Sequence, residues 1–340
     1  MGKKLKKESY TGFDAALDEE QQMKEGKYKK AEKYYDSIFE GVETESLPLP
    51  DRNGEIPERG YLSKEMDTRE SVVLSACEKL GVTPNILFTG LFGVLMTRYS
   101  NSEDSLFATI YNGRNDSRLE NTVCMLVKTL PVYCSCDPKA TIQTYMTELS
   151  EQLLSSMAND IFPFSDICAK YGFSSDLVFA YQAELSDDYP IGDTIARGHD
   201  LSLDISKMPL LIQVREYDHK YVLTAEYRSD KYSEEFVKGI LDAYEAAMDS
   251  MLKAKYISEI SILSGNAAEK IAEFNHTAHE YDRSQTISDM FDEMVEIIPD
   301  HTAVVFKDRK YTYKELDEIS DRLGKYIVSQ ASALRMLYLS

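Results

Sequence analysis

Apolar residues recur at helical spacing in several segments of the chain. Residues 13–40 place Phe, Leu, Ala and Tyr side chains among many Lys and Glu residues, which predicts an amphipathic helix interrupted near Gly26. A second helix is expected to begin at Thr68, whose hydroxyl can cap it, and to end at Gly81. A third is expected to follow directly, with Pro84 at its first helical position.

The most apolar window, residues 86–99, is too short to cross the roughly 30 Å of hydrocarbon in a bilayer and is broken by Gly90 and Gly93. It is therefore predicted to be a buried helix. Apolar stripes at helical spacing predict two more helices, over residues 141–157 and 233–253. These helices need a sheet on which to bury their apolar faces.

Short apolar runs between the helices predict the strands of that sheet. Two runs are continuous enough for strands covered on both faces, at residues 105–112 and 123–132, and residues 175–182 predict a third strand. A hairpin is expected where residues 209–216 return through Asp218 and His219 into residues 221–228. The alternation of helices and strands up to about residue 258 predicts an α/β fold arranged as a two-layer sandwich.

A separate small element is expected near the C-terminus. Residues 303–316, "AVVFKDRKYTYKEL", read as a strand, a tight turn at Asp308 and Arg309, a short return strand and the start of a helix. The threonine before the final "YKEL" can cap that helix.

Charge and cysteine content narrow the classes of partner. With 58 acidic and 38 basic residues the formal net charge is −20, which disfavours nucleic acid and anionic membranes as partners. The five cysteines form no repeating frame, and the pair at Cys134 and Cys136 lacks the second pair of ligands that a zinc site needs. Reduced thiols and the lack of a recognisable targeting signal predict a cytoplasmic protein.

Two catalytic or metal-binding constellations can be assembled from the sequence, and both are rejected. His276, His279 and Asp282 could be offered as metal ligands, but a role without metal is the favoured interpretation. The Ser, His and Asp residues of "GHDLSLD", residues 198–204, could form a hydrolase triad, but the sequence has no Gly-x-Ser-x-Gly element to expose a nucleophile. Metal ligands are therefore not expected in this chain.

The order of several short motifs is more informative than any one of them. In sequence they are "YKKAEKYYDSIFEG" (28–41), "LPLPD" (47–51), "NGR" (112–114), "MLVKTLPV" (125–132), "NDIFPF" (159–164) and "DLVFAYQ" (176–182). In this order they resemble the second lobe of the condensation domain of nonribosomal peptide synthetases. "YTYKEL" (311–316) is similar to the first core motif of the adenylation domain that follows a condensation domain in this family.

The resemblance implies a fold and a division into domains. The fold would be α/β, as one lobe of the chloramphenicol-acetyltransferase-like fold of CoA-dependent acyltransferases, with an incomplete adenylation-domain N-terminus after it. Residues 1–55 would be a helical segment and connector, and residues 56–258 the C-terminal lobe of the condensation domain. A linker would occupy residues 259–282, the start of adenylation residues 283–330, and an atypical tail residues 331–340.

The resemblance also implies a function, part of a peptide-bond-forming acyltransferase. In the family, a His-His-x-x-x-Asp-Gly loop helps an amine to attack a thioester, and none of the five histidines here is adjacent to another. The chain alone is therefore expected to be inactive, with no catalytic residue and no bound cofactor. The intact synthetase would use 4′-phosphopantetheine on carrier domains and ATP with Mg²⁺ at the adenylation domain. Expected partners are peptidyl carrier proteins, the missing N-terminal lobe, and a second copy bound through the exposed lobe interface.

Seven residues are candidates for the substrate tunnel because they match the family's motifs: Arg114, Lys128, Thr129, Phe162, Pro163, Phe164 and Tyr181. By resemblance, Arg114 would pair with the aspartate of the absent loop. Without that carboxylate it is expected to turn to Asp116 or Glu120, or to point into water. Two positions depart from the family, because Cys124 replaces the usual Gly and Lys128 the usual Asn.

Two further functions remain open on the sequence alone. The lobe could be a binding module without catalytic activity, holding a carrier protein or a partner lobe. It could also be an independent CoA-dependent acyltransferase, which would need a histidine on a loop facing the "NGR" turn. The "FPF" residues of the fifth motif could either pack internally or line the passage for a carrier-bound pantetheine arm.

Overall fold

The computed structural model describes residues 9–42, 46–114, 116–174, 176–183, 188–197, 204–280 and 283–331. The chain divides into two compact units, one extending to Lys270 and one beginning at Ile271. The candidate site lies in the first unit, which contains the main sheet.

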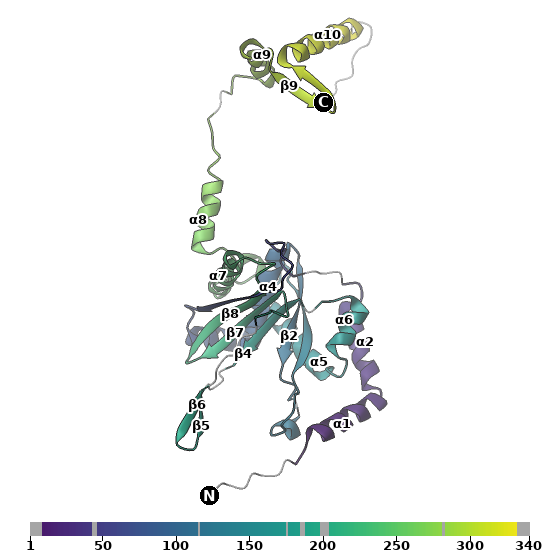
Figure 1. The fold of residues 1–340 in the computed structure, drawn as a ribbon, viewed down its shortest axis with the longest axis vertical. Helices are drawn as coiled ribbons and strands as arrows, with labels where there is room; N and C mark the ends of the chain where they lie inside the picture. Colours follow the sequence, from purple (N-terminus) through teal and green to yellow (C-terminus); the bar gives the residue numbers. More distant parts are fainter. Residues whose placement is uncertain are drawn as a thin grey trace. The chain divides into compact units, whose positions relative to one another are not determined.

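A six-stranded mixed sheet organises the first unit (Figure 1). Its order is β1-β8-β7-β4-β2-β3, in which β4 is parallel to β7 and to β2, and the other neighbours are antiparallel. The strands are β1 (Arg59–Glu65), β2 (Asp104–Tyr111), β3 (Lys128–Ser135), β4 (Leu177–Gln182), β7 (Leu210–Tyr217) and β8 (Lys220–Arg228). A separate two-stranded hairpin consists of β5 (Asp188–Ile191) and β6 (Thr194–Arg197).

Helices in the first unit cover both faces of this sheet to different extents. The helices wholly within this unit are α1 (Gly12–Lys24), α2 (Lys27–Phe39), α3 (Glu70–Leu80), α4 (Pro84–Ser100), α5 (Ile142–Ala158), α6 (Phe164–Tyr171) and α7 (Glu234–Met251). Helix α8 (Gly265–Phe274) includes the boundary between the two units. Short 3₁₀ turns lie at Ser117–Leu119 and Ile257–Glu259. The main layer packs α4 against α5, α7 and the sheet.

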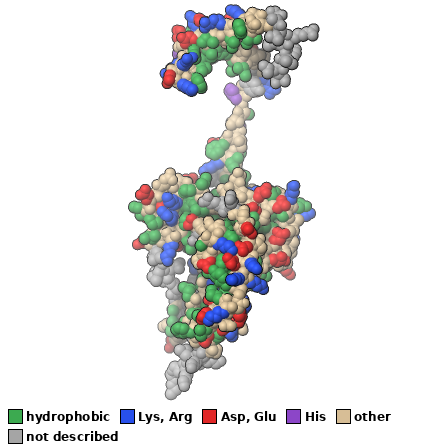
Figure 2. All heavy atoms as spheres, turned by 90° about the vertical axis from the view of Figure 1, so that its right-hand side faces the viewer, with side chains coloured by type: hydrophobic (Ala, Val, Ile, Leu, Met, Phe, Trp, Pro, Cys, Tyr) green, Lys and Arg blue, Asp and Glu red, His purple; other side chains and the backbone are tan. Residues whose placement is uncertain are grey.

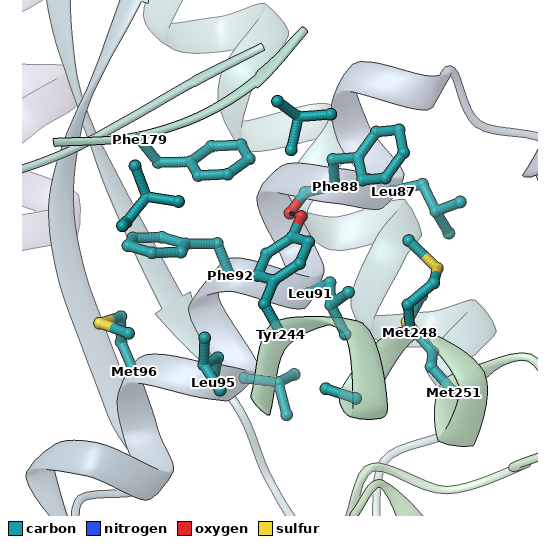
Figure 3. Packing of buried hydrophobic residues seen from close by; sticks show 14 of the residues in the cluster. Leu87, Phe88, Leu91, Phe92, Leu95, Met96, Phe179, Tyr244, Met248 and Met251 are labelled. Carbon is teal, nitrogen blue, oxygen red and sulfur yellow. Dashed lines mark hydrogen bonds between the residues drawn. The ribbon is translucent and has the colours of Figure 1, made fainter. Parts of the chain in front are cut away.

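The main core lies between that helical layer and the sheet. Helix α4 is buried along nearly its whole length, which explains why its sequence is apolar on every side. The Phe92 ring packs edge-on against Phe107 and stacks on Phe179, with ring centroids 4.9 and 4.8 Å apart. Figure 3 shows Leu87, Met248 and Met251 together on the side of the cluster away from Phe179.

A smaller core covers the opposite face at the β2–β3 edge. It brings α2 and α6 together around Tyr35, Phe39, Phe162 and Ile167. The free backbone edge of β3 is also protected, because the side-chain amide of Gln152 accepts a hydrogen bond from the Tyr133 N–H and donates one to its carbonyl, at 3.1 and 2.8 Å. The two-layer sandwich therefore gains a partial third layer at this edge.

Most predicted elements are present, with shifts that have physical causes. Helix α3 is capped at Arg69 rather than Thr68, whose hydroxyl is buried and has no partner in the described part of the chain. The predicted strand at residues 123–132 begins only at Lys128. The antiparallel register pairs Lys128 with Tyr111, the last residue of β2, so residues 123–127 have no strand opposite them.

The second unit confirms the predicted strand-turn-strand-helix order. Helix α9 (Ile287–Ile297) precedes the pair β9 (Thr302–Phe306) and β10 (Arg309–Thr312), and helix α10 (Tyr313–Ala331) follows. The turn lies at Lys307 and Asp308, one residue earlier than predicted, and Lys307 adopts a positive φ of 54°. Hydrophobic side chains are exposed on this unit (Figure 2), and Met290 and Ile297 are among the exposed residues.

The length and composition of the helices bear on whether any of them could span a membrane. Among the described residues, no single helix is long and apolar enough to span a membrane, and the pair α3 and α4 reaches that length only with a bend of 89° between them.

Candidate functional site

The "NGR" turn begins the candidate site at the end of β2. Gly113 is buried with a positive φ of 67°, and a Cβ at this position would lie 1.9 Å from the carbonyl oxygen of Leu126. Only glycine allows the backbone to turn in this conformation and approach that carbonyl so closely. The chain then passes through the Ser117–Leu119 turn before it returns to β3.

Arg114 stabilises this loop through backbone carbonyls. Its guanidinium donates to the carbonyl oxygens of Leu119, Thr122 (3.0 Å) and Cys124 (3.5 Å). The predicted turn toward Asp116 or Glu120 is not seen, whereas Arg114 is exposed, as the alternative in which it points into water predicts. Asp116 is instead bound by Arg118, whose Nη2 lies 2.6 Å from the Asp116 Oδ2. Three carbonyls provide enough acceptors for a guanidinium without a carboxylate.

Helix α1 lies against the other side of this loop. The Tyr10 hydroxyl donates to the Asp18 carboxylate at 2.7 Å, and that hydrogen bond is the main cause that raises the pKa of Tyr10 to about 12. Arg118 joins the contact through its ion pair with Asp18 at 2.9 Å and its position over the Tyr10 ring. The Thr122 hydroxyl donates to the Tyr10 carbonyl at 2.7 Å. Tyr10, which lies just before α1, is thus fixed on the loop.

Lys128 connects three elements at the start of β3. Its ammonium group lies 3.2 Å from the Asp160 carboxylate and 3.4 Å from Glu19, and donates to the Asp160 carbonyl at 3.3 Å. Glu19 belongs to α1, and Asp160 to the turn between α5 and α6. The lysine that replaces the family's asparagine therefore serves as a clamp between elements. Sequence reasoning missed both partners, although Asp160 lies within "NDIFPF".

Asp160 and Tyr111 are half-buried beside this clamp. Burial raises the pKa of Asp160, and the attraction of Lys128 offsets only part of that effect. Burial likewise raises the pKa of Tyr111 to about 12, with the Asp160 charge as a smaller cause. The Tyr111 hydroxyl has no hydrogen-bond partner at standard distance within the described chain. Burial is thus the main cause that raises the pKa of both groups.

These residues surround a cavity of about 280 Å³ between α1 and the loop. Its lining contains the carboxylates of Asp18, Glu19, Asp116 and Asp160 and the cations of Arg118 and Lys128. Both cations are paired with carboxylates, and no histidine is among the lining residues that the structure describes. The arrangement can position a polar group between charges of both signs.

Replacing Lys128 with Met should raise the pKa of Asp160 further. The ammonium opposes the burial penalty in the wild type, so its removal leaves that penalty uncompensated. NMR titration of the Asp160 side-chain carboxyl carbon would measure the change. Lys170→Met is the matched control, because Lys170 pairs with Glu32 and Asp36 instead. An Asp160 pKa that is unchanged or lowered in Lys128→Met would contradict the clamp.

The same raised pKa sets the sign of a pH effect on stability. A carboxyl group whose pKa is higher in the folded than in the unfolded protein binds more protons when folded. Asp160 therefore contributes stability at low pH, and that contribution is lost as the pH rises from the unfolded pKa through the folded pKa.

The other predicted site residues have different surroundings. Thr129 pairs with Ile110 within the sheet. Phe162 is buried in the smaller core, where its ring meets Tyr28 at 5.0 Å and Tyr35 at 5.9 Å, so packing accounts for it. Pro163 is the N-cap of α6, and Phe164 is the first residue of that helix.

Tyr181 lies apart from the cavity. Its hydroxyl donates to Glu216 at 2.8 Å and its ring stacks on Phe88. The structure thus brings Arg114 and Lys128 to one loop and cavity, whereas Phe162 and Tyr181 belong to the two cores.

The rejected constellations lie elsewhere. His276 and His279 are exposed, and Asp282 lies outside the described residues, as do residues 198–203 of "GHDLSLD". His219, at the β7–β8 turn, lies 2.9 Å from Glu70. Within the described ranges, no group of three or more His, Cys, Asp or Glu side chains could hold a metal ion.

Comparison with known protein families identifies the family of this chain. A family model described as "Condensation domain" matches residues 1–272. This chain belongs to the condensation domain family. The matched region includes the whole main sheet, the cavity and both cores.

Curated relatives of this condensation-domain chain are synthases of much greater length. Surfactin synthase subunit 1 of Bacillus subtilis (strain 168) is 25% identical over 336 residues, which are 93% of this chain and 9% of that protein. Bacitracin synthase 1 of Bacillus licheniformis is 24% identical over 258 residues, which are 73% of this chain and 5% of that protein. The chain thus spans less than a tenth of the length of these two relatives.

Solved structures show the same fold, that of condensation domains. The condensation domain from the monacolin K polyketide synthase MokA matches with a TM-score of 0.64 at 14% identity, covering 77% of this chain and 65% of that one. The first condensation domain of the calcium-dependent antibiotic synthetase matches with a TM-score of 0.61 at 14% identity, covering 77% and 60%. The mixed α/β, chloramphenicol-acetyltransferase-like fold is therefore confirmed.

Proposed function

We propose that this chain provides the C-terminal lobe of a nonribosomal peptide synthetase condensation domain, which helps to form amide bonds between carrier-bound aminoacyl or peptidyl thioesters. The family match over residues 1–272 carries the proposal. Coverage of only 60–65% of solved condensation domains supports the assignment to a part of that domain. The sequence has no adjacent pair of histidines. This supports a structural role for the chain in the site rather than catalysis by the chain alone.

The loop beside the cavity supports an interface with a second lobe. Val123, Met125 and Val127 follow the "NGR" turn and are 90, 87 and 54% exposed. Exposed apolar side chains grouped in one segment are a frequent mark of a protein interface. Partners of this region would be an N-terminal lobe and peptidyl carrier domains that present 4′-phosphopantetheine thioesters. Association of two copies of the chain through the same surface stays a prediction. Light scattering would measure it.

The beginning of an adenylation domain is proposed for residues 283–330. Thr286 and Thr312 each cap a helix there through reciprocal contacts with Asp289 and Glu315. ATP and Mg²⁺ would act in the adenylation domain of the intact synthetase. The described residues do not fit a metal site, and no step of that chemistry is assigned to them.

Joining the chain to a condensation-domain segment that carries the His-His-x-x-x-Asp-Gly loop should give amide product. The segment would be fused before residue 1, and one carrier loaded with an acyl group and another with an amino acid would be supplied. Mass spectrometry of the carrier-bound product measures the reaction. The matched control replaces the second histidine of the added loop with Ala and should lose product. A well-folded fusion that forms no product, with both carriers loaded, would argue against the proposal.

A binding module without catalysis is the second candidate. It is favoured by the Lys128 clamp, which places an ion pair where the family has a neutral amide. In that case the fusion would bind a loaded carrier but form no amide. The CoA-dependent alternative is not favoured, since none of the described histidines lines the cavity beside the "NGR" turn.

A further inference from the structure

A second cavity lies in the helical layer, apart from the site described above. It has a volume of about 800 Å³ and is bounded by one face of α3, the first turn of α5 and the residues that end α7. Sites for small molecules generally measure roughly 300–1,000 Å³, so this cavity is large enough for one. None of its lining residues belongs to the cavity at the "NGR" loop.

The base and walls of the cavity are apolar. Leu87, Ile142 and Met251 form its base and are buried, with exposed fractions of 0, 4 and 4%. Leu87 and Met251 lie on the same side of the main core cluster (Figure 3). Val72, which lines the wall, is 42% exposed although it is apolar. Covering that surface with the apolar part of a ligand would remove it from water.

The rim carries a charge opposite to that of the chain. Lys79, Lys253 and Lys255 line the cavity and no Asp or Glu does so among the described residues, although the chain has 58 acidic and 38 basic residues in total. Lys79 and Lys253 are exposed and form no ion pair in the described part of the chain. The first turn of α5 at the same rim adds the positive end of a helix dipole.

We propose that this cavity binds an anionic amphiphile, with a carboxylate at the lysine rim and an alkyl chain over the apolar base. A medium-chain or long-chain fatty acid has this chemistry. Cationic ligands of the same length would meet three like charges at the rim, so the site would discriminate by the charge of the head group.

Decanoate and decyltrimethylammonium test the proposal because both have ten-carbon chains and their head groups are opposite in charge. The chain contains no Trp, so Ser71→Trp would place a single fluorophore at the rim. Decanoate is expected to shift its emission in a saturable way, whereas decyltrimethylammonium is expected to bind more weakly. Ser165→Trp on α6, outside the lining, is the matched reporter and should not respond.

Charge reversal tests the lysine rim. In the Ser71→Trp background, Lys79→Glu combined with Lys253→Glu should weaken decanoate binding about tenfold, since each exposed charge contact contributes modestly. Lys30→Glu, on α2, changes an exposed lysine away from the cavity and should leave the affinity unchanged. Non-saturable binding, equal binding of the two head groups, or unchanged affinity in the double variant would each overturn the proposal.

Discussion

Phe92→Ala should lower the free energy of unfolding of the first unit by about 3–5 kcal/mol. Phe92 is fully buried in the middle of α4, where its ring contacts Phe107 and Phe179. Truncation removes the buried ring and leaves a cavity that the surrounding sheet and helices can fill only in part. Both the lost apolar burial and the lost ring contacts contribute to the expected effect.

Urea unfolding followed by circular dichroism measures this difference. Phe13→Ala is the matched control, because Phe13 on α1 is 85% exposed and its truncation should change stability by no more than about 0.5 kcal/mol. Similar losses in the two variants would contradict the position of the main core.

Gly113→Ala should destabilise the "NGR" loop more than Gly81→Ala destabilises the end of α3. The two glycines have nearly the same left-handed φ, 67° and 66°. A Cβ at Gly81 has no atom within 4 Å, so Ala there costs only the backbone strain, about 1–2 kcal/mol. A Cβ at Gly113 would meet the Leu126 carbonyl at 1.9 Å and force the loop to move. Both variants carry the strain of a left-handed φ, but only Gly113→Ala adds a steric clash. The difference between their stabilities therefore measures the clash.

Hydrogen exchange and urea unfolding together test this second expectation. The amide of Leu119 donates to the Asp116 carbonyl and that of Thr122 to the Leu119 carbonyl, at 2.9 and 3.1 Å. Both amides should exchange faster in Gly113→Ala, because Arg114 loses its positions on the loop carbonyls. They should be unaffected in Gly81→Ala. Equal stability losses and unchanged exchange in the two variants would show that the loop does not depend on this close approach.

Elements with strong local signals were predicted well from the sequence. Thr83, Pro84 and the apolar run after them specified α4, and Gly26 separated α1 from α2 with a positive φ of 85°. The hairpin at Asp218 and His219 is present, with both residues at positive φ. In each case the signal comes from the backbone preference of one or two residues next to a periodic pattern, so no tertiary information is needed.

Elements that depend on distant contacts were missed. Strand β1 was not predicted, and its first two residues were assigned to the end of a proline-rich connector at residues 47–60. Gly60 in fact permits the Tyr227 ring of β8 to lie on its backbone, where a Cβ would be 2.3 Å from a ring carbon. Helix α6 was also not predicted, although Phe164, Ile167, Cys168 and Tyr171 recur at helical spacing over its eight residues. The β5–β6 hairpin was not predicted either.

For the candidate site too, local features were predicted from the sequence and distant contacts were not. The motif resemblance placed Arg114 and Lys128 correctly on one loop and strand, but it could not give their partners. Lys128 meets Glu19 and Asp160, which are 109 and 32 residues away in sequence. The acceptors of Arg114 are backbone carbonyls, which carry no side-chain signal in a sequence. Contacts of both kinds are decided by the tertiary fold.

The most direct test of the central claim is amide formation by the purified chain alone, supplied with one carrier bearing an acyl thioester and another bearing an aminoacyl thioester. Mass spectrometry of the carrier-bound species measures the reaction. The proposed function predicts no product above the uncatalysed background, because the chain would provide one wall of the site and has no adjacent pair of histidines. Product formed by the chain alone at a rate typical of an enzyme would contradict it.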